Sequence, residues 1–332
     1  MSVFGSVLIP EVISVVFENN HWSDACIVPS DSVRFHLGAH VFHYSSTCFE
    51  GLKAFRHEDG GVYIFRMDQN LERLSQSSKL LSLPKVNKEQ VSRMIAAIVA
   101  KYSVDVPFSP GSMYIRPTHI GTEAAIGKAA APSSTSMLYV LLSPVGDYFS
   151  GGSRALRVLV DETNQRCAPH MGMVKSGGNY ASAIYPTLGA KEKYQADQVL
   201  FCPSGYITET GAANFILVDG DEVITKSLDS SLLHGVTRSS ILIIAKSLGM
   251  TVSERDISVD ELLERAAKPK AEAMLSGTAA VLTSVGTLIH NGKDRKVGTG
   301  EAGPVVRRLR QTLNDIQWGK TSDRYNWLTK IA

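Results

Sequence analysis

One lysine stands in an otherwise uncharged, glycine-rich segment of this 332-residue chain. Residues 172–180 are Gly-Met-Val-Lys-Ser-Gly-Gly-Asn-Tyr, so Lys175 is followed five positions later by the aromatic hydroxyl of Tyr180. Since lysines are mostly exposed, a solvent-facing side chain is one interpretation. The other is a lysine that forms a Schiff base, because apolar or cationic neighbours lower the pKa of an amine and the neutral amine attacks an aldehyde. This segment alone leaves both interpretations open.

Pyridoxal phosphate is the obvious aldehyde for such a lysine. It needs an acid at its ring nitrogen, a donor at its phenolic oxygen and an anion site for its phosphate. Glu209 lies in Ile-Thr-Glu-Thr-Gly, at the end of an expected strand, where its carboxylate could meet the ring nitrogen. At an effective dielectric constant near 20, an ion pair at about 4 Å gains roughly 4 kcal/mol, or about three pKa units. That is enough to keep the ring nitrogen protonated at neutral pH.

An anion site for the phosphate is expected where residues 234–238 open a helix. The free N–H groups and the positive dipole end of a helix N-terminus favour an anion. Ser-Gly-Thr at residues 276–278 and the side chain of Arg73 could add donors. Taken singly, these features have ordinary explanations: Glu209 is a turn carboxylate, Thr237 a helix-start residue and Thr278 a turn hydroxyl. Only their combination indicates a cofactor site.

Short strands and two helices are expected in the first half of the chain. Asn87 and Gln90 make the capping box of one helix, which should end near residue 102. The helix before it should run from about residue 68 and stop at Pro84. Apolar runs at residues 113–115 and 137–142 predict buried strands.

The second half alternates strands with helices. Strands are expected at residues 156–160, 198–201, 214–218 and 271–275, and helices at 236–248, from Ser258 and after Pro304. Pro and Gly between residues 144 and 152 mark the best linker. We therefore predict a two-domain protein of mixed α+β and α/β organisation. Its parts are a small N-terminal α/β domain at residues 1–143, an interdomain loop at 144–153 and a large C-terminal cofactor-binding domain at 154–332.

Composition and charge exclude several classes of function. The chain has 34 Lys and Arg against 32 Asp and Glu, a net charge of +2, and no basic stripe, which argues against a nucleic acid partner. No apolar stretch approaches the roughly 20 residues that span a bilayer, and the N-terminus lacks the regions of a signal peptide. We therefore expect a cytoplasmic protein with no membrane partner. The four cysteines are far apart and are expected to be free thiols.

Other motifs fail in their context. The glycines at 298–303 match a dinucleotide-binding pattern, but a polar stretch precedes them and no βαβ unit surrounds them. The histidines at 36, 40 and 43 would converge on a metal only in a helix, whereas Gly38 and nearby aromatic residues favour extended structure. We predict no metal site. The spacing of a phosphate loop and the common hydrolase motifs are absent from the sequence.

Taken together, these segments resemble the branched-chain amino acid aminotransferases among the fold-type IV pyridoxal phosphate enzymes. The match runs from Phe35 to the C-terminal helix, and the signature between the lysine and the glutamate is long and specific. Similar segments are residues 49–55, 65–73, 114–117, 144–149, 175–180, 208–209, 235–238 and 276–279. The resemblance implies the two-domain fold of the D-amino acid aminotransferase type, with the cofactor at the domain interface.

The resemblance also implies roles for cofactor-binding residues. Lys175 would hold pyridoxal 5′-phosphate and move a proton between the substrate Cα and the C4′ atom of the cofactor. Tyr180 would bind the phenolic oxygen, and Glu209 the ring nitrogen. The phosphate would be bound by Arg73, Val236, Thr237 and Thr278.

A substrate pocket is implied in the same way. Tyr114 and the backbone of Thr278 and Ala279 would bind the α-carboxylate, with Arg116 available to the distal carboxylate of glutamate. Aromatic residues would line the side-chain pocket: Phe49, Tyr180, Phe4 and, from the second subunit of a homodimer, Tyr44. Tyr148 would lie on an interdomain loop that closes over the substrate.

Two positions depart from the pattern of some relatives. Ala212 stands where some have threonine, so this wall of the pocket is expected to be altered. Residues 279–283 lack a redox Cys-x-x-Cys that others carry, which excludes thiol regulation at that place.

The implied reaction transfers the amino group of L-leucine, L-isoleucine or L-valine to 2-oxoglutarate and gives 2-oxo acids and L-glutamate. The nearest rivals are another fold-type IV transaminase, for D-amino acids or amines, and a lyase of the aminodeoxychorismate type. Tyr114, Arg116 and residues 49–53 argue against both. A catalytically silent binding protein would be expected to lack Lys175 or Glu209, and the chain has both.

Overall fold

The computed structural model describes residues 4–146, 154–279 and 281–332. The chain forms two compact units. Unit 1 comprises Met1–Tyr148, Val174–Gly177 and Ile316–Ala332, and unit 2 comprises Phe149–Met173 and Gly178–Asp315. The predicted domain boundaries, 1–143, 144–153 and 154–332, stay a prediction for the folding domains. They differ from the two units in one respect: unit 1 also contains Val174–Gly177 and Ile316–Ala332, which the prediction assigned to the C-terminal domain.

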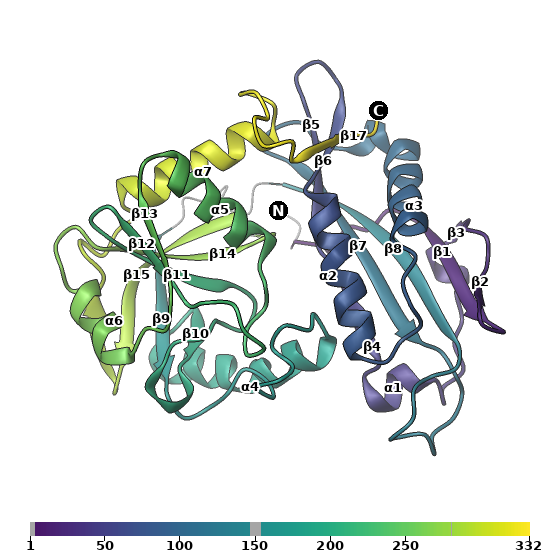
Figure 1. Ribbon diagram of the computed structural model, residues 1–332, viewed down its shortest axis with the longest axis horizontal. Coiled ribbons are helices and arrows are strands. Elements are labelled where there is room, and N and C mark those ends of the chain that lie inside the picture. The colour runs from purple at the N-terminus through teal and green to yellow at the C-terminus, as the bar shows by residue number, and fades with distance from the viewer. Residues whose placement is uncertain (1–3, 147–153, 280) are drawn as a thin grey trace. The chain divides into compact units, whose positions relative to one another are not determined.

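Unit 1 is built on a nine-stranded antiparallel sheet in the order β17-β6-β5-β7-β8-β1-β2, in which β3 also pairs with β1 and β4 with β7. The strands are β1 (Glu11–Glu18), β2 (His21–Trp22), β3 (Cys26–Pro29), β4 (Thr47–Phe49), β5 (Leu52–Arg56), β6 (Val62–Phe65), β7 (Ser112–Gly121), β8 (Ser136–Val145) and β17 (Leu328–Lys330). The helices are η1 (Ser30–Ser32), α1 (His40–Tyr44), α2 (Met67–Leu80), α3 (Lys88–Lys101) and η2 (Ser103–Asp105). Figure 1 shows α2 and α3 beside β7 and β8.

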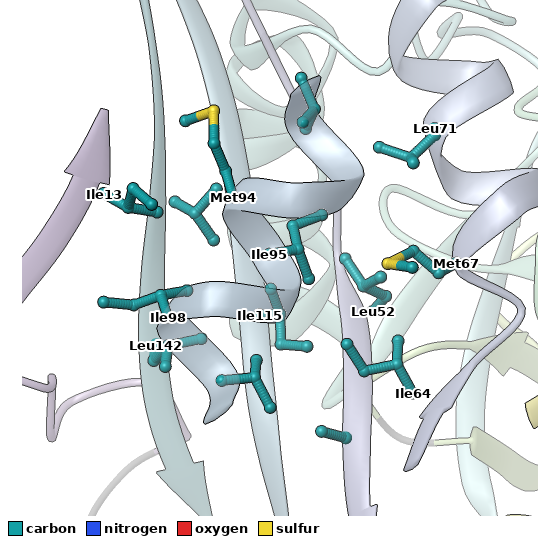
Figure 2. Close-up of a cluster of buried hydrophobic side chains, with 14 of the residues drawn as sticks. Ile13, Leu52, Ile64, Met67, Leu71, Met94, Ile95, Ile98, Ile115 and Leu142 are labelled. Carbon is teal, nitrogen blue, oxygen red and sulfur yellow. The ribbon is translucent and has the colours of Figure 1, made fainter. Parts of the chain in front are cut away.

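The core of unit 1 lies between this sheet and the two long helices. Helix α3 begins where the Asn87 side chain accepts a hydrogen bond from the Gln90 N–H, so the predicted capping box is confirmed. Its apolar face, with Ile95 and Ile98 fully buried, meets the apolar face of α2 and side chains of the sheet (Figure 2). Burial of these side chains stabilises the unit by roughly 1.5–3 kcal/mol for each large residue. The core therefore fixes α2 against the sheet.

Unit 2 is built on an eight-stranded mixed sheet in the order β10-β9-β15-β14-β11-β12-β13, with β16 beside β15. Its strands are β9 (Leu156–Asp161), β10 (Gln198–Phe201), β11 (Asn214–Asp219), β12 (Glu222–Thr225), β13 (Thr251–Glu254), β14 (Glu272–Gly277), β15 (Val281–His290) and β16 (Lys293–Lys296). Its helices are α4 (Gly177–Tyr194), η3 (Pro203–Gly205), α5 (Val236–Ser247), α6 (Val259–Ala266) and α7 (Pro304–Gln317), of which α4 starts and α7 ends in unit 1. The expected helices from residue 236, from Ser258 and after Pro304 are confirmed as α5, α6 and α7.

The histidines at 36–43 correct one expectation. His40 begins the short helix α1, where extended structure was expected. Its Nε2–H donates to the carbonyls of Lys128 and Ala131, at 3.2 Å each, so the start of this helix is anchored to a distant loop. Across the described ranges, no group of three or more His, Cys, Asp or Glu side chains is placed to hold a metal ion.

Two further expectations concern thiols and membranes. All four cysteines are free thiols, as predicted. Among the residues that the structure describes, no helix combines the length and apolarity needed to cross a membrane.

Candidate active site

Strand β7 presents different chemistry on its two faces. Because side chains alternate along a strand, Tyr114 and Arg116 share one face, while Ile115 points into the core on the other. Arg116 Nη2 donates to the Tyr114 hydroxyl at 2.9 Å, and its guanidinium lies 4.5 Å from the ring centroid of Phe49. Phe4 packs edge-on against Tyr114, with ring centroids 5.0 Å apart. Unit 1 thus brings together four residues predicted to line the substrate pocket.

Lys175 joins this group through its backbone. The Phe49 N–H donates to the Lys175 carbonyl at 3.0 Å, and the Lys175 N–H donates to Ser77 Oγ at 3.1 Å. Ser176 forms an isolated β-bridge with Cys48. The lysine amine lies 5.1 Å from the ring centroid of Phe49. The segment that carries the amine is therefore held between β4 and α2, a long-range contact that the local sequence does not signal.

Arg73, predicted to bind the phosphate, makes a buried ion pair in unit 1. Its Nε and Nη2 atoms donate to the two oxygens of Glu50 at 2.7 and 2.8 Å, and the Glu50 side chain is fully buried. Such a bidentate pair fixes the plane of the guanidinium. Glu50 was not identified from the sequence as a partner of Arg73.

Glu209 is held by three donors within unit 2. Arg166 Nη1 lies 2.8 Å from Oε1, the Leu233 N–H donates to Oε1 at 2.7 Å, and Asn214 Nδ2 donates to Oε2 at 3.1 Å. The side chains of Arg166 and Glu209 are each 2% exposed. A cation and two N–H donors all stabilise negative charge on this carboxylate. These contacts favour the charged form of Glu209, which its predicted role at a protonated ring nitrogen requires.

Sequence reasoning missed Arg166. Its guanidinium also lies 5.7 Å from the ring centroid of Tyr180, so it adjoins two predicted cofactor residues of unit 2. The only sequence signal was a basic residue nine positions before Lys175. Nothing local indicated its pairing with a carboxylate 43 positions later.

Asn214, also missed, gathers the other predicted elements of unit 2. It lies opposite Ser276 in the β11–β14 register, next to the turn that contains Thr278. A Cβ added to Gly235 would lie 2.1 Å from Asn214 Oδ1, so only glycine allows this approach at the N-terminus of α5. The buried Ser276 Oγ has no hydrogen-bond partner in the described part of the chain. The side-chain amide of Asn214 therefore lies beside Glu209, the start of α5 with Val236 and Thr237, and the end of β14.

The remaining predicted residues are placed as follows. Tyr44 donates to the Ile126 carbonyl, and its ring lies 4.8 Å from that of His40. Its described contacts therefore do not include Phe4, Phe49, Tyr114 or Arg116. Thr278 and Ala279 are half-buried in the turn after β14. Tyr148 lies outside the described residues. The structure brings Phe4, Phe49, Tyr114, Arg116 and Lys175 together in unit 1, and Tyr180, Glu209 and the start of α5 together in unit 2.

Comparison with known proteins shows the family. Residues 47–287 match the family described as "Amino-transferase class IV". The chain belongs to this family. It is 37% identical to branched-chain-amino-acid aminotransferase 2 of Bacillus subtilis (strain 168) over 318 residues, which is 94% of this chain and 86% of that protein. It is also 37% identical to branched-chain-amino-acid transaminase 1 of the same organism, over 93% of this chain and 88% of that one.

Solved structures agree with this placement. The T.th. branched-chain amino acid aminotransferase with pyridoxamine 5′-phosphate superposes with a TM-score of 0.80 at 26% identity, over 96% of this chain and 98% of that one. The Escherichia coli branched-chain amino acid aminotransferase gives 0.78 at 26% identity, over 96% and 99%. The predicted resemblance and the fold-type IV class are therefore confirmed, and this chain is a branched-chain aminotransferase of the class IV family.

Proposed function

We propose that this aminotransferase moves the amino group of L-leucine, L-isoleucine or L-valine to 2-oxoglutarate, with pyridoxal 5′-phosphate as its cofactor. The observation that carries the proposal is that the Arg116 guanidinium and the Lys175 amine lie 4.5 and 5.1 Å from the ring centroid of Phe49. Such a surface combines an apolar face for aliphatic side chains with a cation for the second carboxylate of glutamate. Relatives named as branched-chain aminotransferases support the same substrates.

The donor set of unit 2 fits a pyridoxal phosphate group. Glu209 is buried and held as a carboxylate by three donors, which suits contact with a protonated ring nitrogen. Ser276 Oγ, buried without a partner in the described part of the chain, adjoins the turn with Thr278. We assign the phosphate to Arg73, Val236, Thr237 and Thr278, and the phenolic oxygen to Tyr180. Structures of the related T.th. enzyme hold pyridoxamine 5′-phosphate in one case and a phosphopyridoxyl glutamate in another.

When bound, pyridoxal phosphate supplies an electron sink for the charge that develops at the substrate Cα. The chain supplies the proton transfer. Lys175 would hold the cofactor, and its Nζ would move the proton between the substrate Cα and the C4′ atom of the cofactor. A fixed backbone on both sides of Lys175 suits this role, because only the side chain then has to move.

Substrate binding is assigned to the aromatic group of unit 1. The Tyr114 hydroxyl and the backbone of Thr278 and Ala279 bind the α-carboxylate, and Arg116 binds the distal carboxylate of glutamate. Phe49, Tyr180 and Phe4 line the side-chain pocket. Tyr44 is assigned to the site of a second copy in a homodimer. One methylene changes binding in an apolar pocket by only about 1–3 kcal/mol, so the three branched substrates should overlap.

Visible absorption tests this function. Purified protein is loaded with pyridoxal phosphate and titrated with L-leucine and then with 2-oxoglutarate, alongside Lys175→Ala and the surface control Lys191→Ala. We expect the visible band to fade with L-leucine and return with 2-oxoglutarate in wild type and Lys191→Ala only. If the band fades only with D-alanine or a chiral amine and not with L-leucine, the family membership stands but the substrate assignment is wrong. No visible band after loading would remove the cofactor assignment.

A further inference from the structure

The core face of β7 carries a buried polar network that the proposed mechanism does not use. His119, which lies opposite Cys48 in the β4–β7 register, is fully buried. Its Nδ1 lies 2.9 Å from Ser78 Oγ, and its Nε2 lies 3.0 Å from Ser136 Oγ. Ser78 Oγ lies 3.3 Å from Cys48 Sγ. We call Cys48, Ser78, His119 and Ser136 the His119 network. All four residues belong to unit 1.

The His119 network is neutral and fully paired. Burial lowers the pKa of His119 to about 3 and raises the pKa of Cys48 to about 12, so neither group is charged near neutral pH. A neutral imidazole has one donor and one acceptor nitrogen, and hydroxyls can serve either, so both tautomers satisfy Ser78 and Ser136. A satisfied polar network in a core favours one arrangement of the elements that it joins, because every alternative leaves a buried polar atom unpaired.

These elements are the ones that hold the lysine. Ser78 belongs to α2, and its neighbour Ser77 accepts the Lys175 N–H. Cys48 belongs to β4, and its neighbour Phe49 donates to the Lys175 carbonyl. Ser78 contacts both Cys48 and His119, so it links α2 to β4 and β7. Ser78 and Cys48 are thus the direct neighbours of the two residues that bind the backbone of Lys175.

We propose that His119 is a positioning residue, which acts through Ser78 to fix α2 against β4 and thereby the backbone of Lys175. The inference rests on the proposed function only in taking Lys175 as the reacting amine. The simpler view is that His119 merely fills the core. The two views differ in which ring nitrogen matters: positioning depends on Nδ1, which contacts α2, whereas filling the core treats both nitrogens alike.

Two substitutions separate the nitrogens. In His119→Asn the side-chain amide stands where Nδ1 is and can keep the contact with Ser78. In His119→Gln the amide reaches the position of Nε2 and can keep only the contact with Ser136. Ser78→Ala and Ser136→Ala remove the two partners in the same way, each by loss of one hydroxyl.

Amide hydrogen exchange of residues 174–177, in protein free of cofactor, is the measurement. We expect His119→Gln and Ser78→Ala to speed this exchange about tenfold, and His119→Asn and Ser136→Ala to leave it within about twofold of wild type. Exchange of β11 in unit 2 serves as the internal control for global unfolding, and should not change. Under saturating cofactor, kcat with L-leucine should fall in the same order.

Several outcomes would overturn the inference. Equal exchange at residues 174–177 in the Asn and Gln variants would reduce His119 to a core residue. So would exchange that changes in β11 as much as at 174–177, since that pattern reports general destabilisation. If one histidine variant fails to fold, the pair Ser78→Ala and Ser136→Ala makes the same distinction. A wild-type protein without transaminase activity would end the proposed function, whereas the exchange pattern would still decide the positioning role.

Discussion

Lys175 in unit 1 and Glu209 in unit 2 are held in opposite ways. In unit 1 the described contacts of Lys175 fix its backbone, through Ser77 and Phe49, and place its amine on an aromatic face. In unit 2 the contacts of Glu209 fix the carboxylate oxygens themselves, through Arg166, Asn214 and the Leu233 N–H. The proposed role of Lys175 is to carry a proton between two atoms, which requires an anchored backbone and a movable side-chain end. The proposed role of Glu209 is to keep a negative charge, which requires that its carboxylate oxygens be held in place.

The difference extends to how each unit encloses its site residue. Burying Arg166 and Glu209 together removes two charges from water, which is tolerable only because they pair with each other and with backbone and amide groups. The described backbone contacts of Lys175, to Ser77 and Phe49, are neutral hydrogen bonds and bury no charge. Substitution of Arg166, the charged partner of Glu209, should therefore destabilise unit 2 strongly. Substitution of Arg116, which lies on the ring of Phe49 in unit 1, should alter activity more than stability.

Arg166→Met gives the largest expected effect, because it leaves Glu209 as a buried, uncompensated charge. We expect the free energy of unfolding to fall by about 3–5 kcal/mol, measured by urea denaturation. Arg154→Met, which breaks an ion pair whose arginine side chain is 65% exposed, should cost no more than about 1 kcal/mol. The double variant Arg166→Met with Glu209→Gln should recover part of the loss. An equal cost for the two single variants would contradict this account of unit 2.

Arg116→Gln tests the aromatic face of unit 1 and should change selectivity with little change in stability. Loss of the proposed charged hydrogen bond from Arg116 to the distal carboxylate would cost about 1.5–3 kcal/mol, so kcat/KM for L-glutamate should fall about 10- to 150-fold. The value for L-leucine should stay within about threefold of wild type. Arg93→Gln, at an exposed position of α3, is the matched control. Equal losses for both substrates would assign Arg116 to folding or to the α-carboxylate.

Local signals predicted helix starts well. The capping residues Asn87 and Ser258 begin α3 and α6, because the side chain that satisfies a free backbone N–H lies within three residues of it. Helix α4 was not predicted, although it directly follows the lysine segment. It contains Pro186, and its apolar residues Ile184 and Leu188 are exposed, so it lacks the buried stripe that marks a helix in sequence.

The candidate site was predictable only as far as its residues form recognisable motifs. Lys175 and Glu209 stand out by type and by neighbours, and the resemblance added the aromatic group. Their supports could not be predicted, because each pairing joins residues far apart in the chain. Arg166 with Glu209, and Ser77 with Lys175, are 43 and 98 positions apart. Such contacts follow from the packing of whole elements, which local spacing does not indicate.

The smallest expected effect is a pH dependence that His119 gives to unit 1. Its pKa is about 3 in the folded protein and about 6.5 in an unfolded chain, so below pH 6.5 the unfolded state binds the extra proton. Stability from this group is full above pH 6.5 and is lost as the pH falls toward 3. Between pH 6.5 and 5.0 the free energy of unfolding should drop by about 1.5 kcal/mol on account of His119 alone.

His119→Asn isolates this contribution, since it retains a neutral amide and cannot take up the proton. Urea denaturation of both proteins at pH 6.5 and 5.0 should show a fall that is about 1.5 kcal/mol larger in wild type. All other titrating groups, among them the carboxylates that are paired in the folded state, are common to both proteins and cancel in this difference. Parallel pH dependences would mean that water reaches the imidazole. A network open to water could not hold α2 and β4 in one arrangement, so the same measurement bears on the anchoring of Lys175.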